Sequence, residues 1–129
     1  MIFVDSSVWI DWFGGTSTEE TQRLDQLLEH EPLVVGDLVL TEVLQGIVHP
    51  RQLRRAREHL LSLTVIDVAG VEIALKAADN YRALRTLGIT PRGTVDTLIA
   101  TRCIEEDWPL LTRDGDFRPF AEHLGLMLI

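Results

Sequence analysis

Apolar and polar positions are grouped in blocks along this chain. Short apolar runs lack an alternating polar face, which is typical of strands buried on both faces of a sheet. These runs predict five strands, at residues 2–4, 33–35, 63–66, 109–112 and 126–129. Between them, apolar residues recur every three or four positions, which predicts helices over residues 18–31, 38–48, 51–61, 71–87 and 94–107.

Strands that alternate with helices in one small domain are typical of a mostly parallel sheet. We therefore predict a three-layer α/β/α fold with a central, mostly parallel five-stranded sheet. The length of 129 residues fits one domain, and neither a linker nor an internal repeat interrupts residues 1–129. Ligands of such sheets bind beyond the carboxyl ends of the strands, so functional residues are expected where the apolar runs end.

Composition excludes several classes of protein. Hydrophobic residues make up 46% of the chain, too many for a disordered acidic tail. The single cysteine, Cys103, excludes an internal disulfide framework and a cysteine-rich zinc site. The first residues lack the basic flank of a secretory signal, and no apolar run approaches the roughly 20 residues of a membrane span. We therefore expect a cytoplasmic protein without a membrane partner.

The net charge argues at first against a nucleic-acid partner. The chain has 20 acidic and 12 basic residues and a net charge of −8, whereas binding to phosphates requires cations. This argument weakens if the acids are concentrated at one metal site, because their charge is then local.

Five acidic residues occupy positions that suggest a shared role. Asp5 directly follows the first apolar run, and Asp114 and Asp116 follow the fourth. Asp96 and Glu42 lie on predicted helices among apolar neighbours. A carboxylate directed toward a core is costly unless it is paired or binds a cation, and the chain has only one lysine. We therefore predict a bound cation, and all-oxygen ligands favour Mg²⁺ or Mn²⁺ over zinc.

Each acid also has a purely structural explanation. Asp5 is placed to cap a helix that begins at Ser6, and Asp96 is an acid of the kind that the helix dipole favours in a first turn. A turn with Asp116 as a helix cap accounts for much of the segment around Asp114. No single position is specific, so the prediction rests on their joint placement.

These residues, in this order, resemble those of the PIN domain, and in particular of the VapC-type ribonuclease toxins of toxin–antitoxin pairs. The matching segments are residues 4–7, 41–43, 95–100 and 111–117, and the resemblance spans the whole chain. It implies a PIN-like fold and a catalytic metal site. The residues that it assigns to this site are Asp5, Glu42, Asp96 and Asp114, with Asp116 as an additional ligand or support.

The resemblance also implies an activity and partners. The activity is hydrolysis of RNA phosphodiester bonds by an endoribonuclease that depends on Mg²⁺ or Mn²⁺, with one or two ions per active site. Ser6 and Thr112 would position carboxylates or water by hydrogen bonds. The implied partners are an RNA substrate, a cognate antitoxin protein and a second copy of the chain in a homodimer, with a higher assembly formed with the antitoxin.

Basic and aromatic residues outside this set have two interpretations each. Arg92 and Arg113 adjoin the acids in sequence and either contact phosphate or balance the acidic charge. A run of arginines indicates either a solvated helix face or an RNA or partner contact; it comprises Arg51, Arg54, Arg55 and Arg57. Aromatic residues at helical spacing favour core packing over a docking patch; they are Trp9, Trp12 and Phe13.

Two other functions stay open on the sequence alone. A phosphoryl-transfer domain also places acids at strand ends, but it requires a lysine near the phosphate, and Lys76 lies within a long predicted helix. A PIN-like module that binds RNA or protein without catalysis is the second alternative. The complete set of acids argues against this module.

Overall fold

A computed structural model, which describes residues 1–129, places four strands in one parallel sheet in the order β3-β2-β1-β4. The strands are β1 Ile2–Val4, β2 Leu33–Gly36, β3 Thr64–Ile66 and β4 Leu110–Leu111. Residue Val4 of β1 pairs with Leu111 of β4. Since the two strands are parallel, the residues that follow Val4 and Leu111 emerge side by side at the carboxyl edge of the sheet.

The predicted fifth strand is reduced to a single bridge. Leu110 pairs in parallel with Leu128, supported by hydrogen bonds from the Leu110 N–H to the Met127 carbonyl and from the Ile129 N–H to the Leu110 carbonyl. Strand β4 is only two residues long, so its outer edge has too few backbone groups for a longer ladder. The sheet therefore has four strands rather than five, and the mixed α/β fold with a parallel sheet is confirmed.

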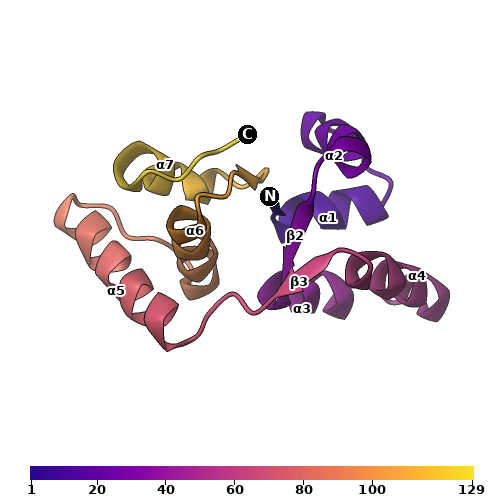
Figure 1. Cartoon of the computed structure of the whole chain (residues 1–129), viewed down its shortest axis with the longest axis horizontal. Coiled ribbons are helices and arrows are strands. Elements are labelled where there is room, and N and C mark those ends of the chain that lie inside the picture. The colour runs from indigo at the N-terminus through magenta and orange to yellow at the C-terminus, as the bar shows by residue number, and fades with distance from the viewer.

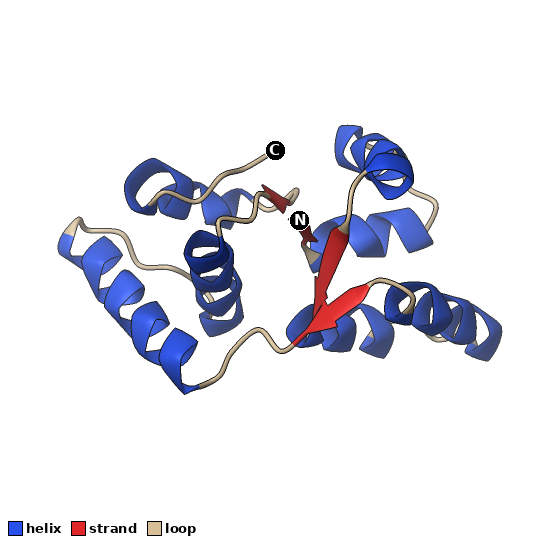
Figure 2. Ribbon diagram, viewed as in Figure 1, coloured by secondary structure: helices blue, strands red, loops and turns tan.

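Seven helices flank the sheet. Helices α1 to α4 lie on one side of the strands and α5 to α7 on the other, as Figures 1 and 2 show. Their bounds are α1 Ser6–Phe13, α2 Glu19–His30, α3 Asp37–Gln45, α4 Pro50–Leu61, α5 Val71–Thr86, α6 Thr94–Glu106 and α7 Arg118–Leu124, with a short 3₁₀ helix η1 at Gly115–Phe117. None of these helices is long and apolar enough to cross a membrane.

Local sequence signals explain several helix boundaries. Thr18 and Thr21 form a reciprocal capping pair at the start of α2, in which each side chain accepts the backbone N–H of the other. Pro50 stands in the first turn of α4, where its missing N–H costs nothing. Gly88, with φ of +80°, follows the end of α5 in the left-handed conformation that favours glycine. The apolar pattern does not predict the short helix α7.

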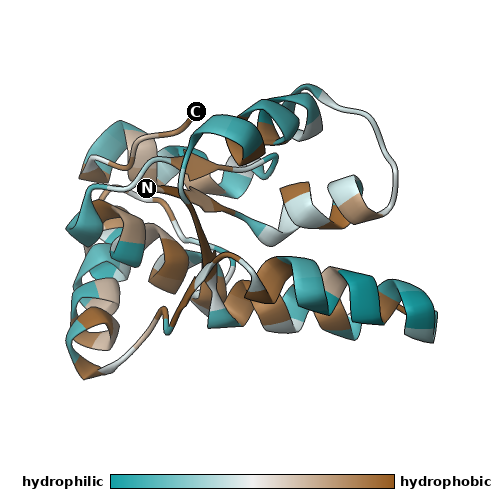
Figure 3. Cartoon of the chain, turned by 45° about the vertical axis from the view of Figure 1, so that its right-hand side comes forward, coloured by the Kyte–Doolittle hydropathy of each residue, from teal (hydrophilic) through white to brown (hydrophobic).

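The core lies between the strands and the inner faces of the helices, and Figure 3 shows apolar strands surrounded by helices with polar outer faces. Phe3 and Val34, on adjacent strands, are fully buried, as is Val68, which follows β3. Gly36 ends β2 beneath these side chains. A Cβ atom at Gly36 would overlap Val68 Cγ2 and lie 2.8 Å from Phe3 Cζ, so the close packing of β2 requires a glycine here.

Two polar contacts hold the segment after β3 in place. The Arg102 guanidinium on α6 donates to the carbonyls of Asp67, Val68 and Ala69 at 3.0, 2.9 and 3.1 Å. The Asp37 carboxylate accepts the backbone N–H of Val68 at 2.9 Å. Arg102 therefore links the end of β3 to helix α6. Asp37 follows a strand, as some of the candidate site acids do, but its carboxylate has a structural role in holding the Val68 backbone.

The packing around Gly36 leads to a stability prediction. Gly36→Ala should lower the free energy of unfolding by about 1–3 kcal/mol, because the added methyl group overpacks the core against Val68 and Phe3. Gly115→Ala is the matched control, since a Cβ atom there meets no atom within 4 Å, and its effect should stay within about 0.5 kcal/mol. Urea denaturation followed by circular dichroism measures both. Equal midpoints for the two variants would contradict this account of the packing.

Candidate metal centre

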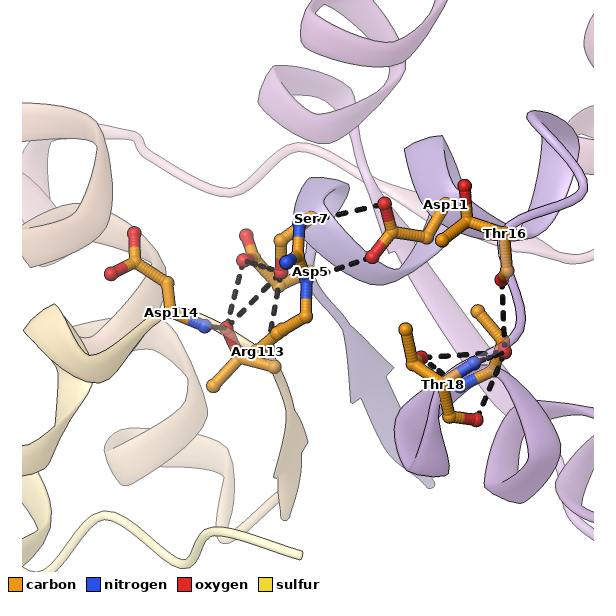
Figure 4. Close-up of polar contacts among 9 residues, drawn as sticks. Asp5, Ser7, Asp11, Thr16, Thr18, Arg113 and Asp114 are labelled. Atoms are coloured by element: carbon orange, nitrogen blue, oxygen red, sulfur yellow. Dashed lines mark hydrogen bonds and ion pairs between the residues drawn. The ribbon is translucent and has the colours of Figure 1, made fainter.

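Asp5 is a buried carboxylate at the carboxyl end of β1, with 3% of its surface exposed. It stands at the cap position of α1, but its side chain makes no capping hydrogen bond. Instead, its Oδ2 atom accepts hydrogen bonds from the Ser7 hydroxyl at 2.8 Å and the Thr112 hydroxyl at 2.9 Å; Figure 4 shows Asp5 beside Ser7. Both bonds go to one oxygen, so Oδ1 stays free to bind a ligand. The capping explanation for Asp5 is therefore wrong.

The two hydroxyl groups also join the ends of β1 and β4. The Thr112 hydroxyl accepts the backbone N–H of Asp114 at 3.0 Å, and the Ser7 hydroxyl accepts the backbone N–H of Arg113 at 3.1 Å. Each hydroxyl thus donates to Asp5 and accepts from the segment that follows β4. This network fixes the position of Asp114 relative to Asp5.

Asp96, Asp114 and Asp116 form the centre of the acidic cluster. Each offers a carboxylate oxygen, and these three oxygens lie within 4.8 Å of one another. Asp96 belongs to the first turn of α6. Asp114 caps η1 by accepting the Asp116 N–H at 2.9 Å, so Asp114 rather than Asp116 is the capping residue. This cap brings the carboxylates of Asp114 and Asp116 close to each other.

The other two predicted acids, Asp5 and Glu42, lie near enough to this group to influence it electrostatically. Burial raises the pKa of Asp96 from 3.8 to about 6, and the negative charges of Asp5, Asp114, Glu42 and Asp116 contribute to this rise in that order. The pKa of Glu42 is also raised, by burial first and then by the charge of Asp5, although the Ser6 hydroxyl opposes this effect. The fold thus brings together acids from β1, α3, α6 and the segment after β4.

The residues of this cluster fit a divalent cation. Glu42 Oε1 is buried without a hydrogen-bond partner, which is costly unless a cation binds there. No arginine or lysine pairs with any of the five acids, because the chain's ion pairs from Lys76, Arg102 and Arg113 go to other carboxylates. Clustered carboxylate oxygens without a nearby protein cation are the ligand type that Mg²⁺ and Mn²⁺ prefer.

The two arginines that adjoin the acids in sequence do not enter the cluster. Arg113 Nε lies 2.7 Å from Asp11 Oδ2 on α1, and Figure 4 shows its side chain directed toward Asp11 and away from Asp114. Arg92 is exposed in the loop before α6 and forms no ion pair. Arg113 is therefore neutralised by Asp11, whereas Arg92 keeps an unpaired charge near the start of α6.

One residue of the network is missing from the sequence prediction. Ser7, not Ser6, bonds to Asp5, whereas Ser6 lies near Glu42. The Asp-Ser-Ser order at the start of a helix contains this signal, because a hydroxyl two residues after an acid can reach back to it. Thr112, which the sequence predicts to position carboxylates, lies against Asp5.

Trp9 and Cys103 have structural roles. Trp9 is fully buried, and its ring stacks on Phe13 and lies 5.8 Å from the ring of His59 on α4, so this group packs α1 against α4. Cys103 is buried in the core of α6, and burial raises the pKa of its thiol to about 12. A thiol with this pKa stays protonated at neutral pH and is not a nucleophile.

Two mycobacterial VapC ribonucleases are similar to this chain over nearly its full length. Ribonuclease VapC11 of Mycobacterium tuberculosis is 31% identical over 131 residues, which cover 98% of this chain and 96% of that protein. The VapC ribonuclease Mb1587 of Mycobacterium bovis matches to the same extent.

Solved structures share the fold. The VapBC2 complex of Rickettsia felis, bound to a DNA fragment from its promoter, contains a chain that superposes with a TM-score of 0.75 at 21% identity, covering 100% of this chain and 98% of that one. VapBC-1 of nontypeable Haemophilus influenzae gives a TM-score of 0.74 at 23% identity, covering 100% and 97%.

A family assignment follows from the sequence match together with the fold. Residues 2–122 match the PIN domain family, and this span contains every acid of the cluster. The parallel sheet flanked by helices agrees with the fold of the superposed chains. The chain belongs to the PIN domain family.

Proposed function

We propose that this chain is a metal-dependent endoribonuclease and the toxin of a VapBC-type toxin–antitoxin pair. The observation that carries this proposal is the convergence of five carboxylates, one with a buried oxygen that lacks a partner, and none with a basic side chain beside it. The names of the similar proteins, VapC ribonucleases, support RNA as the substrate class.

The proposed ligands are Asp5, Glu42, Asp96 and Asp114, with Asp116 as an additional ligand, for one or two Mg²⁺ or Mn²⁺ ions. When bound, the metal lowers the pKa of a water molecule and stabilises the charge that develops on the phosphate. The chain supplies the rest by position. The Ser7 and Thr112 hydroxyls hold Asp5 Oδ2 and leave Oδ1 free, and the η1 cap holds Asp114 beside Asp116.

The carboxylates of this site are the proposed metal ligands, and the thiol and hydroxyl groups near them are not suited to act as covalent nucleophiles. The Cys103 thiol has a raised pKa and is buried, and the hydroxyls of Ser7 and Thr112 are already bonded to Asp5. Hydrolysis by water is therefore the reaction that this arrangement supports. Arg92, with its unpaired charge, is available to contact the RNA phosphate, whereas Arg113 must first leave Asp11.

The proposal includes two protein partners. Chains of similar fold come from VapBC complexes of several bacteria, which supports a cognate antitoxin for this chain. We also propose a homodimer that assembles further with that antitoxin. The phosphoryl-transfer alternative loses support, because Lys76 pairs with Glu72 and Glu105 at 3.3 and 3.2 Å and so lies outside the acidic cluster.

Removing a proposed ligand should abolish RNA cleavage without unfolding the protein. Asp5→Asn and Asp96→Asn should each reduce cleavage at least about 100-fold, because the isosteric amide removes the charge that binds the metal. Sequencing the ends of total cellular RNA incubated with the protein and Mn²⁺ measures cleavage and locates the sites.

The matched control for this experiment is Asp67→Asn, because Asp67 also follows a strand but is exposed and outside the cluster. It should cleave like the wild type. Full activity of the wild-type protein in excess EDTA, or normal activity of both ligand variants, would contradict the proposal.

The hydroxyl network should tune metal affinity. Thr112→Val removes a hydrogen bond to Asp5 and the acceptor of the Asp114 N–H, so the dissociation constant for Mn²⁺ should rise about 10- to 100-fold. Thr112→Ser keeps the hydroxyl and should bind Mn²⁺ nearly as the wild type does. Isothermal titration calorimetry measures both. A wild-type protein that binds no Mn²⁺ would favour the non-catalytic binding module instead.

The pKa of Asp96 leads to a prediction about pH and stability. The folded state holds this proton up to about pH 6 and the unfolded state only to about pH 3.8, so the folded state binds more protons between these values. The metal-free protein should therefore become less stable as the pH rises through this window. Asp96→Asn should raise the free energy of unfolding at pH 7 by about 1–2 kcal/mol and flatten the pH dependence.

Urea denaturation in EDTA at pH 4.5 and pH 7, compared with denaturation in Mn²⁺ at pH 7, measures these effects. Mn²⁺ should stabilise the wild type more than the variant, because the variant lacks one ligand. A metal-free variant that is no more stable than the wild type at pH 7 would contradict the prediction, because ionisation of Asp96 would then not destabilise the folded state.

A further inference from the structure

A groove of about 600 Å³ lies outside the acidic centre, between α1, α3 and the start of α4, three helices that adjoin one another in Figure 1. Its two walls differ in chemistry. The α1 wall presents Ile10 and Phe13, and Ile10 is 50% exposed. Val43, Ile47 and Val48 extend this apolar lining over α3 and the segment that follows it. The opposite wall presents the polar side chains His49, Gln52 and Arg55. The groove therefore has one apolar wall and one polar wall that carries positive charge.

This groove lies about one helical turn from the acidic centre. Ser6 and Ile10 lie one turn apart on α1, and Glu42 and Gly46 lie one turn apart on α3, so each pair shares a helix face. Ser6 lies close enough to Glu42 to lower its pKa, whereas Ile10 and Gly46 line the groove. A ligand in the groove is therefore about one helical turn from Glu42, and from Asp5, which precedes Ser6.

The wall on the α4 side carries charge that no carboxylate of the chain neutralises. Among the 12 basic residues, only Lys76, Arg102 and Arg113 form ion pairs. Four of the others are exposed within seven residues of α4, at Arg51, Arg54, Arg55 and Arg57. Arg55 lines the groove, and Arg51, one turn earlier, lies on the same side with Arg54 at its border, whereas Arg57 projects from another side of the helix.

We propose that an RNA strand reaches the metal centre through this groove, with its bases against the α1 wall and its phosphates against Arg51 and Arg55. The inference rests on the proposed nuclease function and adds the path of the substrate. A single strand of RNA has bases with apolar faces and an anionic backbone, which match the two walls. In a chain of net charge −8, these unpaired arginines supply the cations that phosphate binding requires.

Charge-matched arginine variants test this path. The first is Arg51→Gln/Arg55→Gln on α4, and its control is Arg82→Gln/Arg85→Gln, which removes the same charge from two exposed arginines of α5 on the other side of the strands. The probe is a fluorescein-labelled single-stranded RNA 20-mer of random sequence, and fluorescence anisotropy in EDTA at several salt concentrations measures its binding without cleavage. Thermal denaturation confirms that both variants fold, and the single variant Arg51→Gln repeats the test with a smaller change.

The groove variant should bind RNA roughly tenfold more weakly than the wild type, and the control within about twofold. The slope of log affinity against log salt should fall by about 0.7 for each phosphate that an arginine no longer neutralises. On an RNA that carries a mapped cleavage site, the groove variant should raise KM and leave kcat nearly unchanged, since neither arginine lies among the proposed ligands.

Three results would overturn the inference. They are equal loss of RNA binding in both variants, no RNA binding by the wild type at low salt, and RNA binding that is unchanged while affinity for poly-L-glutamate falls. The last result would assign the arginines to an acidic polypeptide partner. Because the binding assay needs no catalysis, RNA binding through the groove without metal-dependent cleavage would refute the proposed nuclease function and leave the groove assignment in place.

Discussion

Repulsion among carboxylates is the interaction on which the rest of this structure depends. Asp5, Glu42, Asp96, Asp114 and Asp116 lie close enough together to contribute, with burial, to a pKa of about 6 for Asp96. Such a cluster opposes folding in the absence of a cation, because like charges out of water destabilise one another. The surrounding fold must therefore hold these side chains against their own repulsion.

The sheet and two hydroxyl groups supply that support. Parallel pairing of β1 with β4 places Asp5 and Thr112 at the same edge, and the Ser7 and Thr112 hydroxyls bond both to Asp5 and to the backbone after β4. Close packing at Gly36 keeps the neighbouring strand β2 in place. The folded chain thus holds a strained arrangement of charges that a bound divalent cation would relieve.

The distribution of charge matters more than its total. The net charge of −8 suggests a protein that repels nucleic acid, yet much of the acidity is gathered at one edge of the sheet. Arg113 is neutralised by Asp11, whereas the arginines of α4 form no ion pairs. The fold therefore separates an acidic centre that suits a metal from a basic helix that suits a polyanion, and the groove that Arg55 lines lies near both.

The sequence alone indicated the alternation of strands and helices and the family resemblance, because buried strands and helix periodicity are local patterns. It also singled out the five candidate acids, because acids at strand ends are visible along the chain. It overestimated the length of the last strand, because that length depends on pairing with the neighbouring strand β4, which has only two residues. It also missed Ser7 and gave Asp5 a capping role among its alternatives. Only the tertiary structure decided these points, because they depend on segments that are distant in the chain and meet through folding. Examples are the hydrogen bond between Asp5 and Thr112, the pairing of Arg113 with Asp11 and the groove beside Arg55.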